Sequence, residues 1–84
     1  MDIKKELSEL IVYLTAVNEE TLLSDEGWKY MGIDSLDVLE IMLAVSNKFN
    51  ITINVEDEEK LLNFGLLLAY IENKINTVDT SEET

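Results

Sequence analysis

Four consecutive residues, Gly32-Ile33-Asp34-Ser35, are the place in this chain where chemistry is most readily imagined. The glycine interrupts regular structure, and the acid and the hydroxyl stand directly before an apolar-periodic segment where a helix is predicted to begin. Asp34 or Ser35 could cap that helix by accepting hydrogen bonds from N–H groups of its first turn. Alternatively, the Ser35 hydroxyl could carry a phosphate ester, because a helix N-terminus favours anions. The residues alone leave both roles open.

The composition excludes most other chemistry. The chain has no cysteine and no histidine, which removes disulfides, thiolate nucleophiles and every serine-histidine or cysteine-histidine catalytic arrangement. No nucleophile–base pair and no metal cluster can be assembled, so we expect a non-catalytic protein without a metal site. A separate enzyme would have to modify Ser35. An acid-rich calcium sensor is a weaker alternative, since the loop of spaced Asp and Asn residues with a terminal glutamate is missing.

Size and charge set the class of protein and of partner. Eighteen acidic and six basic residues among 84 give a net charge of −12, which disfavours nucleic acid and anionic lipid and attracts basic protein surfaces. A hydrophobic fraction of 46% nevertheless argues for a folded domain. No run approaches the ~20 apolar residues of a membrane span, and the first residues are not a signal peptide. We expect a soluble, cytoplasmic monomer.

Four helices, three long and one short, are predicted to position the 32–35 segment. Apolar residues recur every three or four positions in the long helices, whereas the segment between the first two loses this periodicity and is predicted to be a long loop. Leu22, Leu23, Trp28 and Met31 are expected to hold that loop on the core. The predicted helices cover residues 3–17, 35–49, 56–62 and 64–75, the last capped by Asn63. The fold class is therefore a small all-α bundle, with a folded domain over residues 1–76 and a disordered acidic tail over 77–84.

The helix over 35–49 has two apolar faces. At ~100° per residue, its first face is a normal core stripe, formed by Val38, Ile41, Met42, Val45 and Phe49. Leu36, Leu39 and Leu43 fall on a different arc, with Glu40 at its border and Asp37 further round. Another element could cover this second face, some of its leucines could be scattered surface residues, or it could be an exposed ridge that docks a partner.

Residues 32–53 resemble the acyl carrier protein family. That family has a Gly-x-Asp-Ser-Leu motif, then a helix with acidic and aliphatic residues at these offsets, then Phe-x-Ile/Val-x-Ile. The similarity continues through residues 56–61 and 69–71, and it covers about 3–75 of the chain. Motif, size, acidity, helix order and long first loop agree together.

The resemblance implies that Ser35 is the attachment site of 4′-phosphopantetheine, transferred from coenzyme A by a phosphopantetheinyl transferase. The group's thiol would carry an acyl or aminoacyl cargo as a thioester, and Asp34 would serve transferase recognition. The positions at which carriers meet loading and transferring enzymes with basic docking surfaces correspond to Leu36, Asp37, Leu39, Glu40 and Leu43. The alternative is a small acidic helical interaction module in which Ser35 is only a cap.

Several departures from the family pattern imply a specialised carrier. The usual Phe-x-x-Asp/Glu-Leu is replaced by the run 28–31, in which Tyr30 takes the place of the acid. Residues 46–48 lack the family's late acids, and Asn54 stands where proline is frequent. Leu66 and Leu67 occupy positions where small residues often line the acyl pocket, so a long fatty chain should be poorly sequestered. Fatty acid, polyketide, aminoacyl and alanyl cargo all remain open.

Overall fold

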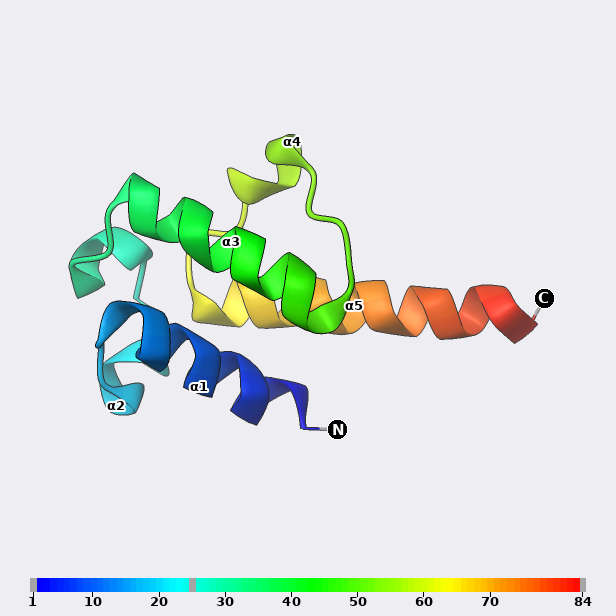
Figure 1. Ribbon diagram of the computed structural model, residues 1–84, viewed down its shortest axis with the longest axis horizontal. Helices are drawn as coiled ribbons and strands as arrows, with labels where there is room; N and C mark the ends of the chain where they lie inside the picture. The colour runs from blue at the N-terminus through cyan, green and yellow to red at the C-terminus, as the bar shows by residue number, and fades with distance from the viewer. Residues whose placement is uncertain (1, 25, 84) are drawn as a thin grey trace.

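Three long helices build the protein, as a computed structural model shows (Figure 1). The structure describes residues 2–24 and 26–83, and it describes side-chain surroundings for 2–24 and 26–75. The elements are α1 (Ile3–Thr15), α2 (Glu19–Leu22), the 3-10 helix η1 (Trp28–Met31), α3 (Ser35–Phe49), α4 (Val55–Glu58) and α5 (Phe64–Glu83). The described part of the chain contains no strand, only an isolated bridge between Gly27 and Asn63. The all-α prediction is confirmed.

Side-chain caps determine where the long helices begin. The Asp2 carboxylate accepts the Lys5 N–H at 3.1 Å in front of α1. The Asn63 side chain accepts the Leu66 N–H at 2.8 Å in front of α5, which confirms the predicted cap. Each cap satisfies one of the N–H groups that a first helical turn leaves without an intrahelical partner.

The ends of α1 and α3 lie where the backbone turns left-handed. Ala16 has φ 62° and Asn50 has φ 54°, and each N–H donates back into its helix. The predicted span 35–49 for α3 is confirmed, whereas α1 ends at Thr15, two residues before the predicted end at 17. The left-handed residue stops the helix although the apolar periodicity continues to Val17.

The segment between the first two long helices, predicted to be a long loop, contains two short elements in addition to the predicted helices. Its residues form α2 and η1, each a single turn too short to show helical periodicity in the sequence. Asn18 caps α2 by accepting the Thr21 N–H at 2.8 Å, and Leu22 is buried behind it. Trp28 of η1 is also buried, but Leu23 is 36% exposed and does not hold the segment down as expected.

The predicted third helix is shorter than expected. α4 covers Val55–Glu58 rather than 56–62, and none of its residues is buried. It is held partly by the Tyr70 hydroxyl of α5, which donates a hydrogen bond to the Asp57 carboxylate at 2.8 Å. Leu61, in the turn that follows, supplies the buried apolar contact.

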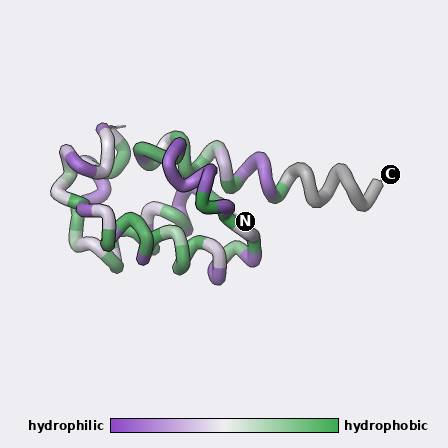
Figure 2. The backbone as a smooth tube through the Cα atoms, turned by 90° about the horizontal axis from the view of Figure 1, so that it is seen from above, coloured by the Kyte–Doolittle hydropathy of each residue, from purple (hydrophilic) through white to green (hydrophobic). Residues whose placement is uncertain are grey.

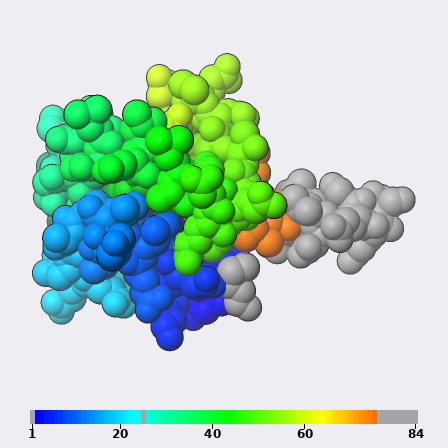
Figure 3. All heavy atoms as spheres, in the orientation of Figure 1, coloured from blue at the N-terminus to red at the C-terminus, as the bar shows by residue number. Residues whose placement is uncertain are grey.

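The core lies between α1, α3 and α5, with the shorter elements closing its edges. α1 runs opposite to α3 and α5 (Figure 1), and it lies beside α3 on the face in Figure 3. Apolar and polar residues alternate along the long helices, as amphipathic packing requires (Figure 2). The buried apolar side chains are Leu7, Ile11, Leu22, Trp28, Ile33, Ile41, Met42, Val45, Phe49, Leu61, Phe64, Leu67 and Ile71.

Two predictions concern the rest of the chain. The boundary at 76 and the disordered tail over 77–84 lie outside the residues whose side chains are described, so both stay predictions. Among the described residues, none of the helices combines the length and apolar character needed to cross a bilayer.

Candidate functional site

Asp34, and not Ser35, caps α3. The backbone of Asp34 is extended, with φ −86° and ψ −179°, and its Oδ1 accepts the Asp37 N–H at 3.0 Å. Its carbonyl oxygen accepts the Val38 N–H, also at 3.0 Å. Ser35 is the first helical residue, and its side chain is exposed with no hydrogen bond to any described residue. The Ser35 hydroxyl therefore does not cap α3, although the sequence had left that role open.

The segment before Ser35 is anchored on the core. Gly32 has φ +81°, a left-handed backbone conformation that residues other than glycine rarely adopt. A Cβ at this position would have no atom within 4 Å apart from those of its chain neighbours, so the backbone angle, and not lack of space, favours glycine here. Ile33 is buried, and its N–H donates to the Trp28 carbonyl at 3.0 Å. Because Ile33 points inward, Asp34 and Ser35 are left outward at the start of α3.

The second apolar face of α3 is exposed. Leu36, Leu39 and Leu43, hereafter the α3 ridge, have exposed fractions of 74%, 47% and 60%. Glu40 is also exposed and Asp37 is half-buried, so acids border the ridge. The opposite face carries the predicted core stripe: Ile41, Met42, Val45 and Phe49 are buried and Val38 is half-buried. These exposures exclude a covering element among the described residues and leave the face open to solvent, as a docking surface requires.

An open apolar groove of about 360 Å³ lies beside Ser35, which is one of its lining residues. Trp28, Tyr30 and Ile33 line it from the segment of η1, Val38 from α3, and Leu62 from the segment after α4. Sequence reasoning missed Leu62 and gave Tyr30 no place in a site. Only the fold brings these two residues to Ser35, and no spacing in the sequence signals it.

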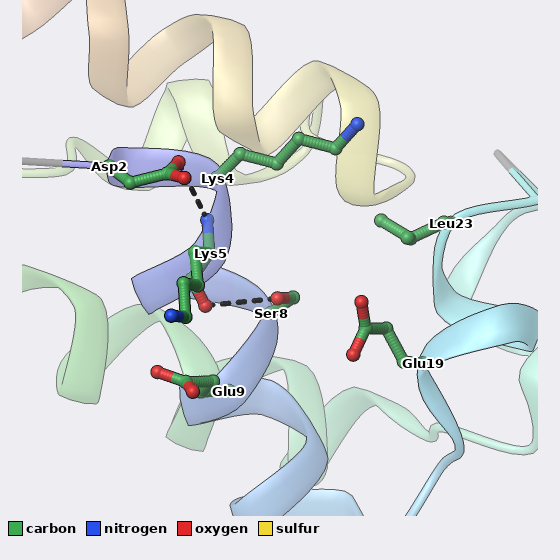
Figure 4. Close-up of a pocket in the computed structure, with 7 residues that line it drawn as sticks. All are labelled: Asp2, Lys4, Lys5, Ser8, Glu9, Glu19 and Leu23. Carbon is green, nitrogen blue, oxygen red and sulfur yellow. Dashed lines mark hydrogen bonds between the residues drawn. The ribbon is translucent and has the colours of Figure 1, made fainter.

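A second hollow lies between the start of α1 and α2 and shares no residue with the Ser35 groove (Figure 4). Charged side chains of both signs line it, including Lys4, Glu9 and Glu19. The hydrogen bonds drawn there belong to α1 itself: the Asp2 cap, and the Ser8 hydroxyl donating to the Lys5 carbonyl at 3.0 Å. Within the described part of the chain, no group of three or more His, Cys, Asp or Glu could hold a metal ion.

Comparison with known proteins identifies the family of this chain. The family model described as "Phosphopantetheine attachment site" matches residues 5–71, so the chain belongs to that family. The acyl carrier protein of Wolinella succinogenes is 37% identical over 73 residues, 86% of this chain and 96% of that protein. The acyl carrier protein of Nitratidesulfovibrio vulgaris is 31% identical over 75 residues, 88% of this chain and 99% of that protein.

A third relative matches over a shorter stretch. The acyl carrier protein of an Exiguobacterium species is 49% identical over 45 residues, which is 54% of this chain and 57% of that protein. The chain is thus a member of the acyl carrier protein family, a family of carriers that are generally non-catalytic. Its function is that of an acyl carrier, with 4′-phosphopantetheine as the covalently attached prosthetic group.

The residues at the start of α3 fit such a group. A phosphodiester needs an exposed hydroxyl for its bond and an environment that accepts negative charge. The Ser35 hydroxyl is exposed and unbonded among the described residues, and it lies at the N-terminus of a 15-residue helix. The helix dipole favours an anion at that end.

Proposed function

We propose that Ser35 is the residue that carries 4′-phosphopantetheine in this acyl carrier. The observation that supports it is the division of roles between neighbours: Asp34 caps α3, which leaves the Ser35 hydroxyl outward and unbonded among the described residues. When bound, the group supplies a thiol that holds an acyl or aminoacyl cargo as a thioester. Because the chain has no histidine, a separate phosphopantetheinyl transferase must activate the hydroxyl.

Asp34 is proposed to act in recognition by that transferase. Its Oδ1 is engaged by the Asp37 N–H, which fixes the carboxylate beside Ser35. The residue as a whole is exposed, so its second oxygen is available to an approaching enzyme. Asp34 would thus position the start of α3 and present a negative charge next to the reacting hydroxyl.

We further propose that acyl-loading and acyl-transferring enzymes dock on the α3 ridge. Leu36, Leu39 and Leu43 supply the apolar contact, and Asp37 and Glu40 supply acids that basic partner surfaces would meet. The net charge of −12 should speed association with such partners at low salt.

Substitutions on the ridge test this docking proposal. Leu39→Ala should raise the KM of an acyl-transferring enzyme for the loaded protein, and the increase should be larger for the double variant with Glu40→Gln. Val55→Ala is the matched control, because Val55 is 75% exposed but lies on α4. An unchanged KM in both ridge variants contradicts docking there.

The cellular setting is proposed from the sequence alone. A chain without cysteine, with a strongly acidic composition, fits a cytoplasmic monomer that serves fatty acid biosynthesis or a more specialised polyketide or secondary-metabolite pathway. Intact mass of the protein isolated from its native cells would identify the cargo, and its elution on size exclusion would report oligomeric state. Recovery in the membrane or secreted fraction would contradict the location.

Enzymatic loading tests the attachment site. Incubation with coenzyme A, magnesium and a promiscuous phosphopantetheinyl transferase should add one prosthetic group to the wild-type intact mass. Ser35→Ala should abolish the addition. Ser46→Ala is the matched control, since that hydroxyl already donates to the Met42 carbonyl at 2.9 Å. Loading that survives Ser35→Ala would place the group on another residue and contradict the Ser35 proposal. A wild-type protein that is not loaded would favour the alternative, an interaction module in which Ser35 has only a structural role; no present observation favours it.

A further inference from the structure

The groove beside Ser35 has no part in the attachment chemistry described above. Tyr30 and Leu62 contribute to it from segments far apart in the sequence, and both are strongly exposed, at 82% and 60%. Removing exposed apolar side chains of this size from water lowers the free energy, so a ligand that covers them would be bound favourably.

Hydrogen bonds hold the two sides of the groove in place before any ligand binds. The Trp28 N–H donates to the Leu62 carbonyl at 3.1 Å, and the Trp28 indole N–H donates to the Leu61 carbonyl at 2.7 Å. These bonds tie η1 to the segment that carries Leu62. A Cβ placed on Gly27 would lie 3.6 Å from Cδ2 of Tyr30 and 3.5 Å from the Leu62 carbonyl oxygen. The Tyr30 ring and the Leu62 backbone therefore both lie near Gly27.

The group attached to Ser35 is the ligand that this groove meets first. Going outward from the serine oxygen, 4′-phosphopantetheine has a phosphodiester and then a carbon bearing two methyl groups, its most apolar segment. Because Ser35 itself lines the groove, a group tethered there is present at high effective concentration. Lys29 also lines the groove, and its ammonium group would attract the phosphodiester.

We propose that this groove binds the prosthetic arm between transfers, with Tyr30 and Leu62 contacting its dimethyl segment. The proposal rests on attachment at Ser35. Tyr30 and Leu62 would then be positioning residues that keep the arm on the protein surface, on the side of α3 next to η1. Lys29 would favour the same placement through its charge.

NMR of the loaded protein tests the proposal without an enzyme assay. The protein is loaded with an arm labelled with ¹³C at the geminal methyl groups, and complete modification is confirmed by intact mass. We expect nuclear Overhauser cross-peaks from these methyl protons to the Tyr30 ring and to the Leu62 methyl groups. Tyr30→Ala and Leu62→Ser should each lose the cross-peaks to the substituted side chain and move the methyl shifts toward those of free pantetheine.

Tyr13→Ala is the matched control, because Tyr13 is 85% exposed on α1 and does not line the groove. It should leave the methyl shifts and cross-peaks unchanged. A fully loaded protein whose methyl shifts equal those of free pantetheine, or do not respond to Tyr30→Ala and Leu62→Ser, overturns the groove proposal alone. Failure of loading at Ser35 overturns the attachment proposal and this one with it, and the mass measurement separates the two results.

Discussion

The indole N–H of Trp28 donates a hydrogen bond to the carbonyl oxygen of Leu61 at 2.7 Å, across 33 positions of the chain. Both residues are buried, so this bond joins η1 to the turn before α5 inside the core. The backbone bond from Trp28 to Leu62 reinforces it at 3.1 Å. The segment that leads to Ser35 is thereby fixed to the segment just before α5.

Removing the indole donor should weaken this connection. Trp28→Phe keeps an aromatic ring but leaves the buried Leu61 carbonyl without its partner, which should lower the free energy of unfolding by about 1–3 kcal/mol. Urea unfolding measures the loss, and the backbone amide at position 28 should exchange faster with solvent deuterium in the variant. Tyr13→Phe, at an exposed position, should change stability little. A Trp28→Phe variant as stable as the wild type would show that the bond contributes nothing.

Tyr70 makes stability depend on alkaline pH. Burial raises the pKa of its phenol above the ordinary value, the hydrogen bond to Asp57 raises it further, and Lys74 opposes both. The folded protein therefore holds this proton more tightly than the unfolded chain. The resulting stabilisation is present below pH 10.0 and is lost as pH rises through the folded-state pKa.

A carbon-detected NMR titration of Tyr70 checks this dependence. Asp57→Asn should lower the Tyr70 pKa toward the ordinary value because it removes the carboxylate. The stability difference between the wild type and Tyr70→Phe should shrink above the wild-type Tyr70 pKa. An unchanged Tyr70 pKa in Asp57→Asn would contradict the contribution assigned to Asp57.

Leu66 and Leu67 have opposite environments although the family pattern suggested that both would fill an acyl pocket. Leu67 is fully buried, whereas Leu66 is 46% exposed, so that part of the expectation is wrong for Leu66. Leu67→Ala should lower the free energy of unfolding by about 2–5 kcal/mol. Leu66→Ala should cost about 0.5 kcal/mol or less.

The same pair tests cargo length. If the Leu67 side chain limits the space between helices, Leu67→Ala should slow hydrolysis of a long-chain acyl thioester relative to the wild type, and Leu66→Ala should not. Equal protection of long and short acyl groups by the wild-type protein would contradict the expectation of poor sequestration.

Substitutions of Asp34 and of Ser35 should differ in their effect on the stability of the protein. Asp34→Ala removes the cap of α3 and should cost about 1 kcal/mol in the free energy of unfolding. Ser35→Ala removes a hydroxyl that bonds to no described residue and should cost about 0.5 kcal/mol or less. Urea unfolding of both variants is the measurement. A larger loss for Ser35→Ala than for Asp34→Ala would indicate that the serine has the structural role.

Much of the fold could be predicted because long helices leave a periodic pattern and capped ends. α3 is predicted over its whole length, and Asn63 marks the start of α5. α2 and η1 could not be predicted in this way, because a single turn has no period to detect. The left-handed turn at Ala16 was also hidden, since alanine is not a residue that signals a helix end.

The candidate site, like the fold, could be predicted from the sequence only in part. The motif around Ser35 and the two faces of α3 lie within a continuous stretch of chain, so sequence reasoning reached both. Whether the α3 ridge was covered depended on the packing of other helices, which spacing along α3 cannot reveal. The groove depends on Tyr30 and Leu62, whose segments are joined by the hydrogen bonds of Trp28 and do not reveal their proximity in the sequence.

Mapping the prosthetic group within the loaded protein tests the central claim most directly. Trypsin cleavage after Lys29 and Lys48 releases the peptide 30–48, which contains two serines, Ser35 and Ser46. Fragmentation of this peptide should place the phosphopantetheine mass on Ser35 and leave Ser46 unmodified. Finding the group on Ser46, on another peptide, or on no residue would contradict the assignment of Ser35 as the carrier site.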